Sequence, residues 1–115
     1  MPYFNAILLA PLMVVLFYSF VLFDRLLRAE YQQHRPSWEA DGRPAGFFWR
    51  ARECDLLTSS LSRISLTFAW LFRTPAWVAS SPALVTLLQR HRLAVLFWNI
   101  GVFVWFLIFL SALHD

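Results

Sequence analysis

The segment that decides the fold is the charge-free run from Leu93 to Leu113, which reads LAVLFWNIGVFVWFLIFLSAL. The basic triplet Arg90-His91-Arg92 precedes it, and His114-Asp115 follows it. A helix rises about 1.5 Å per residue, so this run is long enough to cross the roughly 30 Å hydrocarbon core of a bilayer. It therefore predicts a transmembrane helix near the end of the chain.

The composition agrees with one small membrane domain covering residues 1–115. The chain is 59% hydrophobic and 18% aromatic but only 15% charged, whereas about a quarter of the residues in a soluble domain are charged. A formal net charge of +3 could suggest a nucleic-acid ligand. In a membrane protein the same excess of arginine is expected beside the cytoplasmic leaflet, so we expect no nucleic-acid partner. The single cysteine excludes an intramolecular disulfide.

A second charge-free run near the start of the chain predicts another transmembrane helix over residues 4–23. Its apolar part, NAILLAPLMVVLFYSFVLF, has no basic residue before it and no small-x-small cleavage site after it. We therefore interpret it as a retained membrane span and not as a signal peptide. Good helix formers continue to about residue 35, where Pro36 disfavours the helical conformation of the preceding residue.

The segment between the two runs is predicted to fold as a loop over residues 36–60 and a helix over residues 61–73. Asp41-Gly42 is a turn signal. The helix has apolar residues at helical spacing and is too short to span a bilayer, so we expect it to lie in the interfacial plane or on a partner subunit. The residues expected to dock on lipid or on a partner are Phe47, Phe48, Trp49, Ile64, Phe68, Leu71 and Phe72.

Two Ser/Thr-Pro pairs predict helix starts in the last third of the chain. Thr74-Pro75 predicts a short turn, and Ser81-Pro82 predicts a long helix over residues 82–113 that contains the span at 93–113. The expected fold class is an all-α membrane protein. Two antiparallel transmembrane helices are joined by a basic cytoplasmic segment that contains an interfacial amphipathic helix.

The arginines predict the orientation. All ten basic residues are arginines, and all lie between the two charge-free runs. Because basic loops stay on the cytoplasmic side, residues 24–92 are expected to be cytoplasmic and both termini to be periplasmic, in a multi-pass protein of the bacterial inner membrane.

Polar side chains inside the runs suggest how the two helices pack. Asn99 is about 10 Å deep in the second run, and Tyr18 and Ser19 are about 8 to 9 Å deep in the first. An amide side chain in hydrocarbon is stabilised by a hydrogen bond to a polar group, and hydrogen bonds between transmembrane helices contribute about 0.6 to 2 kcal/mol. We predict that Asn99 bonds to the Tyr18/Ser19 level; the alternative is a bond to its own backbone or to a lipid.

The second run also has two distinct faces. Ala94, Trp98, Gly101 and Trp105 cluster within about 60° of a helical wheel, whereas Asn99 falls on the other side with Phe103, Phe106 and Leu110. We predict that the Trp/Gly face contacts another protein and that the other face contacts the first helix. The alternative is that the large aromatic residues simply face lipid.

The sequence contains no HExxH, CxxC, GxSxG or glycine-rich phosphate loop. We therefore expect a non-enzymatic accessory or assembly subunit of a larger inner-membrane complex of the respiratory, photosynthetic or transport kind. It would bind that complex through the second span and the aromatic loop. No cofactor is expected; bound phospholipid, membrane lipids and further copies of the chain are compatible partners.

Two alternatives remain open. The arrangement of a span near each end and a basic middle resembles the bacterial universal stress protein B type, which implies a free-standing stress-response membrane protein. The resemblance covers the layout alone, so no residue role is carried over. The other alternative is a small subunit that carries a pigment or haem; against it, His34, His91 and His114 are all predicted at membrane surfaces.

Overall fold

The computed structural model describes residues 2–114, so Met1 and Asp115, the end residues of the predicted domain, lie outside the described part. The elements are α1 (Pro2–Gln33), α2 (Arg35–Ala40), α3 (Leu56–Phe72), α4 (Ala76–Ala79) and α5 (Pro82–His114). Every element of the described residues is a helix, which confirms the all-helical prediction.

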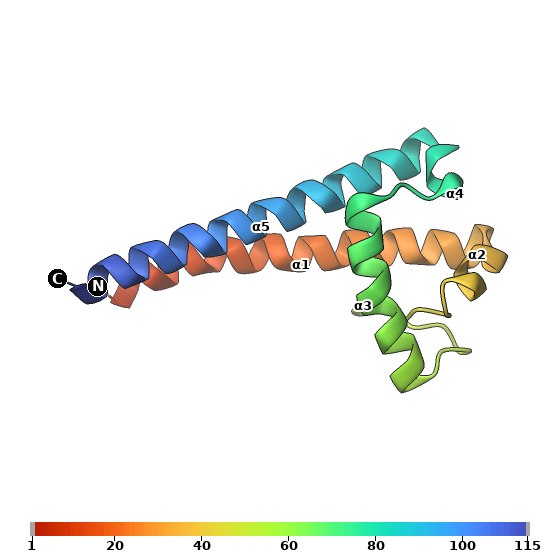
Figure 1. The fold of residues 1–115 in the computed structure, drawn as a ribbon, viewed down its shortest axis with the longest axis horizontal. Helices are drawn as coiled ribbons and strands as arrows, with labels where there is room; N and C mark the ends of the chain where they lie inside the picture. The colour runs from red at the N-terminus through yellow and green to blue at the C-terminus, as the bar shows by residue number, and fades with distance from the viewer. Residues whose placement is uncertain (1, 115) are drawn as a thin grey trace.

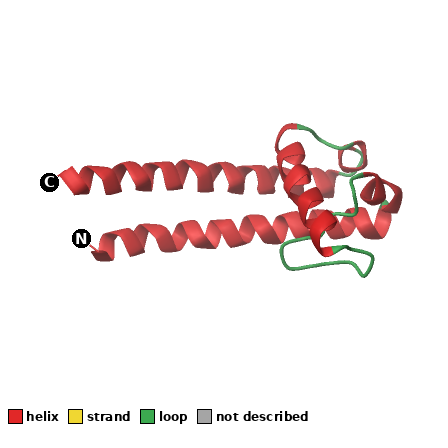
Figure 2. Cartoon of the chain, turned by 60° about the horizontal axis from the view of Figure 1, so that its bottom comes forward, coloured by secondary structure: helices red, strands yellow, loops and turns green. Residues whose placement is uncertain are grey.

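The two long helices, α1 and α5, lie side by side and antiparallel, with their outer ends together at one end of the molecule (Figures 1 and 2). Each is long and apolar enough to cross a membrane, which is consistent with a two-span membrane protein. The helices approach closely at Gly101, where a Cβ atom would collide with the side chain of Leu12. A glycine at this position therefore sets the distance between the spans.

The segment between the two charge-free runs forms what we call the head, residues 24–92, which includes the inner ends of α1 and α5. Within it, α3 runs across the pair of long helices, and α2 and α4 lie beyond it (Figures 1 and 2). A single cluster of buried side chains joins these elements. Its members are Phe23, Leu26, Leu27, Trp38, Ala51, Leu66, Trp70, Trp77, Val78, Leu84 and Leu88.

The predicted loop over residues 36–60 is helical at both of its ends. Pro36 does not end the helical structure: α2 begins at Arg35, after the single non-helical residue His34. Proline fits the first turn of a helix, where its missing N–H costs no hydrogen bond. At the other end, α3 begins at Leu56 instead of residue 61, because Asp55 caps it by accepting the Thr58 N–H at 3.3 Å.

Thr74, which the sequence predicted at the start of a short helical turn, does not cap that turn in the structure. The residue that caps α4 is Pro75, which makes no side-chain hydrogen bond. The Thr74 hydroxyl instead accepts a hydrogen bond from the guanidinium of Arg92 at 3.2 Å. Arg92 also donates to the carbonyl of Trp70 at 2.8 Å, so it fastens the end of α3 to α5.

Candidate functional site

A carboxylate at the head end of α1 holds the aromatic loop. Asp24 is buried and accepts the backbone N–H groups of Phe47, Phe48 and Trp49 at 2.7, 2.8 and 3.0 Å. The carboxylate lies so close to the loop that a Cβ atom on Gly46 would sit 2.5 Å from its oxygen. Only glycine fits there, and the turn is fixed to α1 by charge-assisted hydrogen bonds.

Most of the predicted aromatic cluster stabilises the head. Phe47 stacks on Phe20 with ring centres 4.0 Å apart, and Trp49 meets Tyr31 edge to face at 5.3 Å. Phe48, by contrast, is 61% exposed. Of the three loop aromatics expected to dock on lipid or protein, the structure therefore leaves Phe48 as the accessible one.

The predicted docking face of α3 is exposed along its length. Ile64, Phe68 and Phe72 lie on it, while Leu71 is half-buried. Leu61, the first residue of the predicted helix, is also exposed on this stripe, and Leu57 extends it because α3 starts earlier than expected. The buried residues Ser59, Leu66 and Trp70 lie on the opposite side of the helix.

The two faces of α5 are reversed relative to the prediction. Ala94 is buried and Gly101 contacts Leu12 of α1, so the face expected to bind another protein packs on the chain's own first helix. Trp98 and Trp105 lie along this face and are half-buried. The physical reason is that small residues permit close backbone approach, and this outweighs the preference of an amide for a partner.

The side expected to contact α1 is open. Phe103 is 61% exposed, and Phe106, Leu110 and Asn99 are exposed beside it. The predicted hydrogen bond between the helices does not occur among residues 2–114: Asn99 donates to the Val95 carbonyl at 2.7 Å. This backbone bond is the alternative that the sequence left open.

The two residues expected opposite Asn99 have other surroundings. The Ser19 hydroxyl donates to the carbonyl of Leu16, one turn back on its own helix, at 2.7 Å. Tyr18 is 46% exposed, on the outside of α1. Ser19 and Asn99 nevertheless line one cavity of about 140 Å³ between α1 and α5.

His91 is the functional candidate that sequence reasoning placed wrongly. It is only 2% exposed, against the expectation of a solvated surface histidine. Its Nδ1 lies 3.0 Å from the Ser19 carbonyl oxygen, and its ring lies 5.8 Å from that of Phe23. Its Nε2 has no hydrogen-bond partner in the part of the chain that the structure describes. His91 also lines the cavity between the long helices.

A second buried polar group, Glu30, lies in the head, seven residues beyond the charge-free run of α1. Its side chain is fully buried, and its carboxyl oxygens have no hydrogen-bond partner among the described residues. Burial raises the pKa of the Glu30 carboxyl to about 9; the neighbouring Asp41 carboxylate adds to the rise, and the Trp77 indole partly opposes it. Glu30 is therefore protonated at neutral pH.

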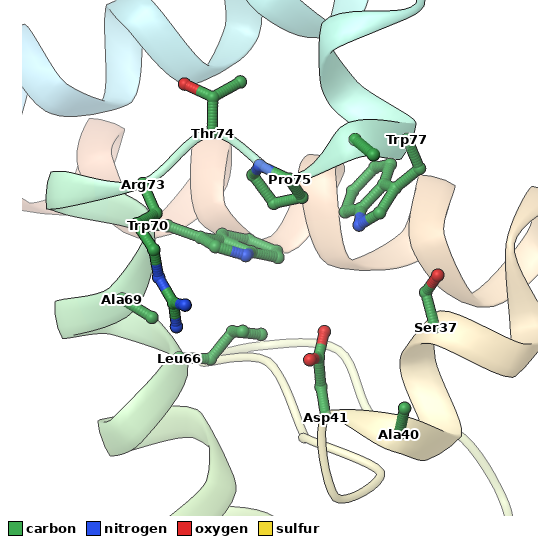
Figure 3. Close-up of a pocket in the computed structure, with 11 residues that line it drawn as sticks. Ser37, Ala40, Asp41, Leu66, Ala69, Trp70, Arg73, Thr74, Pro75 and Trp77 are labelled. Atoms are coloured by element: carbon green, nitrogen blue, oxygen red, sulfur yellow. The ribbon is translucent and has the colours of Figure 1, made fainter.

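A cavity of about 370 Å³ lies between α2, α3 and α4, next to these neighbours of Glu30 (Figure 3). Asp41 and Arg73 reach it from opposite sides, and Trp70 and Trp77 form part of its wall (Figure 3). Within residues 2–114 no group of three metal-ligating side chains is close enough to hold a metal ion.

We compared the chain with protein-family models, curated proteins and solved structures, and found no match in any of the three comparisons.

Proposed function

We propose that the protein is a non-catalytic accessory subunit of a larger bacterial inner-membrane complex. In this proposal α1 and α5 cross the membrane, the head lies in the cytoplasm and both ends of the chain lie in the periplasm. The orientation is supported by the arginines, all ten of which fall within residues 25–92.

The observation that carries the proposal is the open side of α5. Asn99 is exposed there, and its only side-chain hydrogen bond within the described residues uses one N–H on the Val95 carbonyl. At about 10 Å from the start of the span, the rest of the amide would face hydrocarbon. A polar group left unpaired in such surroundings costs about 1 to 3 kcal/mol. A transmembrane helix of a larger protein that carries a polar side chain would remove this cost.

The aromatic ridge beside Asn99 gives such a helix an apolar surface. Phe103, Phe106 and Leu110 continue along the same side, and their exposed fractions are 61%, 48% and 40%. The partner that fits this surface is therefore an integral membrane protein and not a cytoplasmic one.

The residues of α3 that line two different cavities indicate how this helix is rotated about its own axis. Thr67 lines the cavity between α1 and α5, whereas Ala69 and Arg73 line the cavity beside α2. At about 3.6 residues per turn, Thr67 and Ala69 lie on nearly opposite edges of the helix. One edge therefore faces the spans, and the other faces the far end of the head.

The exposed stripe of α3 is apolar toward the spans. Ile64 and Leu71 lie on the Thr67 side, while Ser62 and Ser65 lie on the Ala69 side. A helix that lies in the headgroup region has its apolar side toward the acyl chains and its polar side toward water. The run of α3 across the long helices (Figure 1) suits this position. In our proposal lipid covers the stripe, which leaves the open side of α5 for the partner protein.

Purification from native membranes in a mild detergent tests the proposed function. The chain is expected to copurify with a larger membrane protein at a fixed ratio. Phe103→Ala is expected to reduce the recovered partner about tenfold or more, because truncation of an aromatic hot-spot residue costs about 2 kcal/mol or more and about 1.4 kcal/mol is tenfold in affinity.

Phe97→Ala provides the matched control. Phe97 is 60% exposed and Phe103 is 61% exposed, but the two rings lie on different sides of α5. The control is expected to retain the partner. A wild-type chain that always purifies alone, or an equal loss with both variants, would contradict the proposal; purification alone would favour a free-standing membrane protein.

A further inference from the structure

A third cavity, of about 520 Å³, lies between the aromatic loop and the first half of α3. Residues 45–50 form one wall, and Leu56, Ser60 and Arg63 form the other. Its volume is within the range of roughly 300 to 1,000 Å³ that is usual for small-molecule sites. Among the described residues, the charged side chains that line it are Arg50 and Arg63, and no carboxylate lines it. The cavity therefore suits an anionic group.

The edge of α3 that lines this cavity faces the spans. Its lining residues, Leu56, Ser60 and Arg63, are spaced at four and three residues, so they share one edge of the helix. Thr67, four residues after Arg63, continues that edge and lines the cavity between α1 and α5. With α3 in the headgroup region, as proposed above, the third cavity lies on the edge of the helix that is turned toward the acyl chains.

Aromatic contacts fix the level of the third cavity along α1. Phe47 stacks on Phe20 with ring centres 4.0 Å apart, and Phe48 stacks on Phe17 at 5.9 Å. Phe17 and Phe20 belong to the last two turns of the charge-free run in α1. The aromatic wall of the cavity therefore lies beside the inner end of the first span, where acyl chains meet headgroups in the proposed placement.

Arg63 is held at this level with two donors free. Its guanidinium lies over the Phe47 ring, 4.9 Å from the ring centre, and its Nη1 donates to the Gly46 carbonyl at 3.1 Å. Its Nε and Nη2 have no hydrogen-bond partner among residues 2–114, and neither atom is fully enclosed. These two nitrogens lie on one side of the guanidinium, which is the side that binds two oxygens of a phosphate through parallel N–H groups.

The positive charge of the two arginines is not neutralised within the described residues. Arg50 is exposed, and neither Arg50 nor Arg63 forms an ion pair within residues 2–114. Asp24, the carboxylate at this turn, is occupied by three backbone N–H groups. Two positive charges therefore remain beside the inner end of the first span, and basic residues at this level attract the anionic lipids of the membrane surface.

We propose that the third cavity binds the phosphodiester of an anionic phospholipid. Nε and Nη2 of Arg63 donate to two phosphate oxygens, and Arg50 supplies the second positive charge. The acyl chains cover Phe48 and Leu56, which line the cavity and are 61% and 72% exposed. This inference rests on the membrane placement in the proposed function, but it does not depend on the partner complex.

Two other phosphates fit the cavity less well. Inorganic phosphate offers the same oxygens, but it has no acyl chains to cover the exposed side chains of Phe48 and Leu56. A zwitterionic phospholipid has acyl chains, but its ammonium group would lie near two arginines and reduce the attraction. Both serve as probes in the test.

Native mass spectrometry of the whole purified protein in a non-ionic detergent tests the proposal. Phosphatidylglycerol is titrated in about 0.15 M ammonium acetate, in which charges are screened over about 8 Å. One molecule is expected to bind wild type about tenfold more tightly than phosphatidylcholine. Arg63→Gln removes the paired donors and is expected to weaken the Kd about tenfold, a change of about 1.4 kcal/mol. Arg50→Gln removes one charge and is expected to weaken it about fivefold.

Arg73→Gln is the matched control. Arg73 is also an exposed arginine, but it does not line the third cavity. It lies ten residues after Arg63, about 15 Å along the axis of α3, which exceeds the screening length. This variant is expected to bind within about twofold of wild type. Thermal melting identifies an Arg63→Gln protein that fails to fold, in which case Arg50→Gln and Arg73→Gln decide the outcome.

Three results would overturn the proposed lipid site. They are equal affinity of wild type for phosphatidylglycerol and phosphatidylcholine, equal weakening by Arg50→Gln and Arg73→Gln, and displacement of the lipid by an equal concentration of inorganic phosphate. The test is separate from that of the proposed function. A chain that purifies alone but shows the expected lipid binding would refute the accessory role and support the lipid site.

Discussion

Replacement of Asp24 by alanine is expected to lower the unfolding free energy of the head by at least about 3 kcal/mol. Three backbone N–H groups, those of Phe47, Phe48 and Trp49, lose their acceptor at once. Each hydrogen bond to a charged group contributes about 1.5 to 3 kcal/mol, and the three do not add fully because they share one carboxylate. Thermal melting in detergent measures the loss, and limited proteolysis shows whether the loop around Gly46 becomes the first site of cleavage.

Asp55→Ala is the matched control for Asp24. Asp55 is an exposed carboxylate that caps α3 through the N–H and hydroxyl of Thr58. Loss of such a cap costs about 1 kcal/mol and should leave the aromatic loop protected. Equal destabilisation by Asp24→Ala and Asp55→Ala, or an unchanged cleavage pattern with Asp24→Ala, would contradict the anchoring role of Asp24.

The stability of the protein is expected to fall as the pH rises, because of Glu30. The pKa of this carboxyl is about 9 in the folded protein, against an ordinary value of 4.5 for a solvated glutamate. Below the lower value the group is protonated in both states, so its contribution to stability is fully present there. Above it the unfolded chain ionises while the folded protein does not, and stability is lost until the pH passes the folded pKa. At pH 7 the loss is on the order of 3 kcal/mol.

Glu30→Gln should remove this pH dependence, since glutamine keeps the size of a protonated glutamate and does not ionise. Between about pH 7 and pH 9, above the range in which the lowered pKa of the buried His91 affects stability, the melting temperature of wild type is expected to fall, while that of the variant stays nearly flat and is higher at pH 8. Glu39→Gln, which changes an exposed glutamate, should follow wild type. A wild-type melting temperature that is constant over this range, or a Glu30→Gln protein that is less stable at pH 8, would refute the account of Glu30.

The sequence predicted the two long helices because membrane crossing demands a long run without charge, and such a run is visible without tertiary information. The faces of α5 were harder to assign. Both sides of a membrane helix are apolar, so no contrast between core and surface marks the buried side. The small residues Ala94 and Gly101 were the usable signal, and they point to close helix packing.

Local sequence patterns could not predict the long-range contacts that stabilise the head. Asp24, Glu30 and His91 each appear as one polar residue near the end of a helix, and their roles depend on partners far away in sequence. Asp24 binds a loop more than twenty residues later, and His91 binds the carbonyl of Ser19 from the other long helix. One missed signal was local: Asp55, a preferred capping residue, marked the start of α3 five residues before the first residue predicted.

The orientation of the two long helices in the membrane underlies the proposed function, and cysteine labelling tests it most directly. The only native cysteine is replaced in a Cys54→Ser background. Single cysteines are then placed at Gln32, exposed in the head, and at His114, exposed at the end of α5. With a membrane-impermeant maleimide on intact spheroplasts, our account predicts that only the position-114 cysteine reacts and that the position-32 cysteine reacts after lysis. Reaction at position 32 in intact spheroplasts would contradict it.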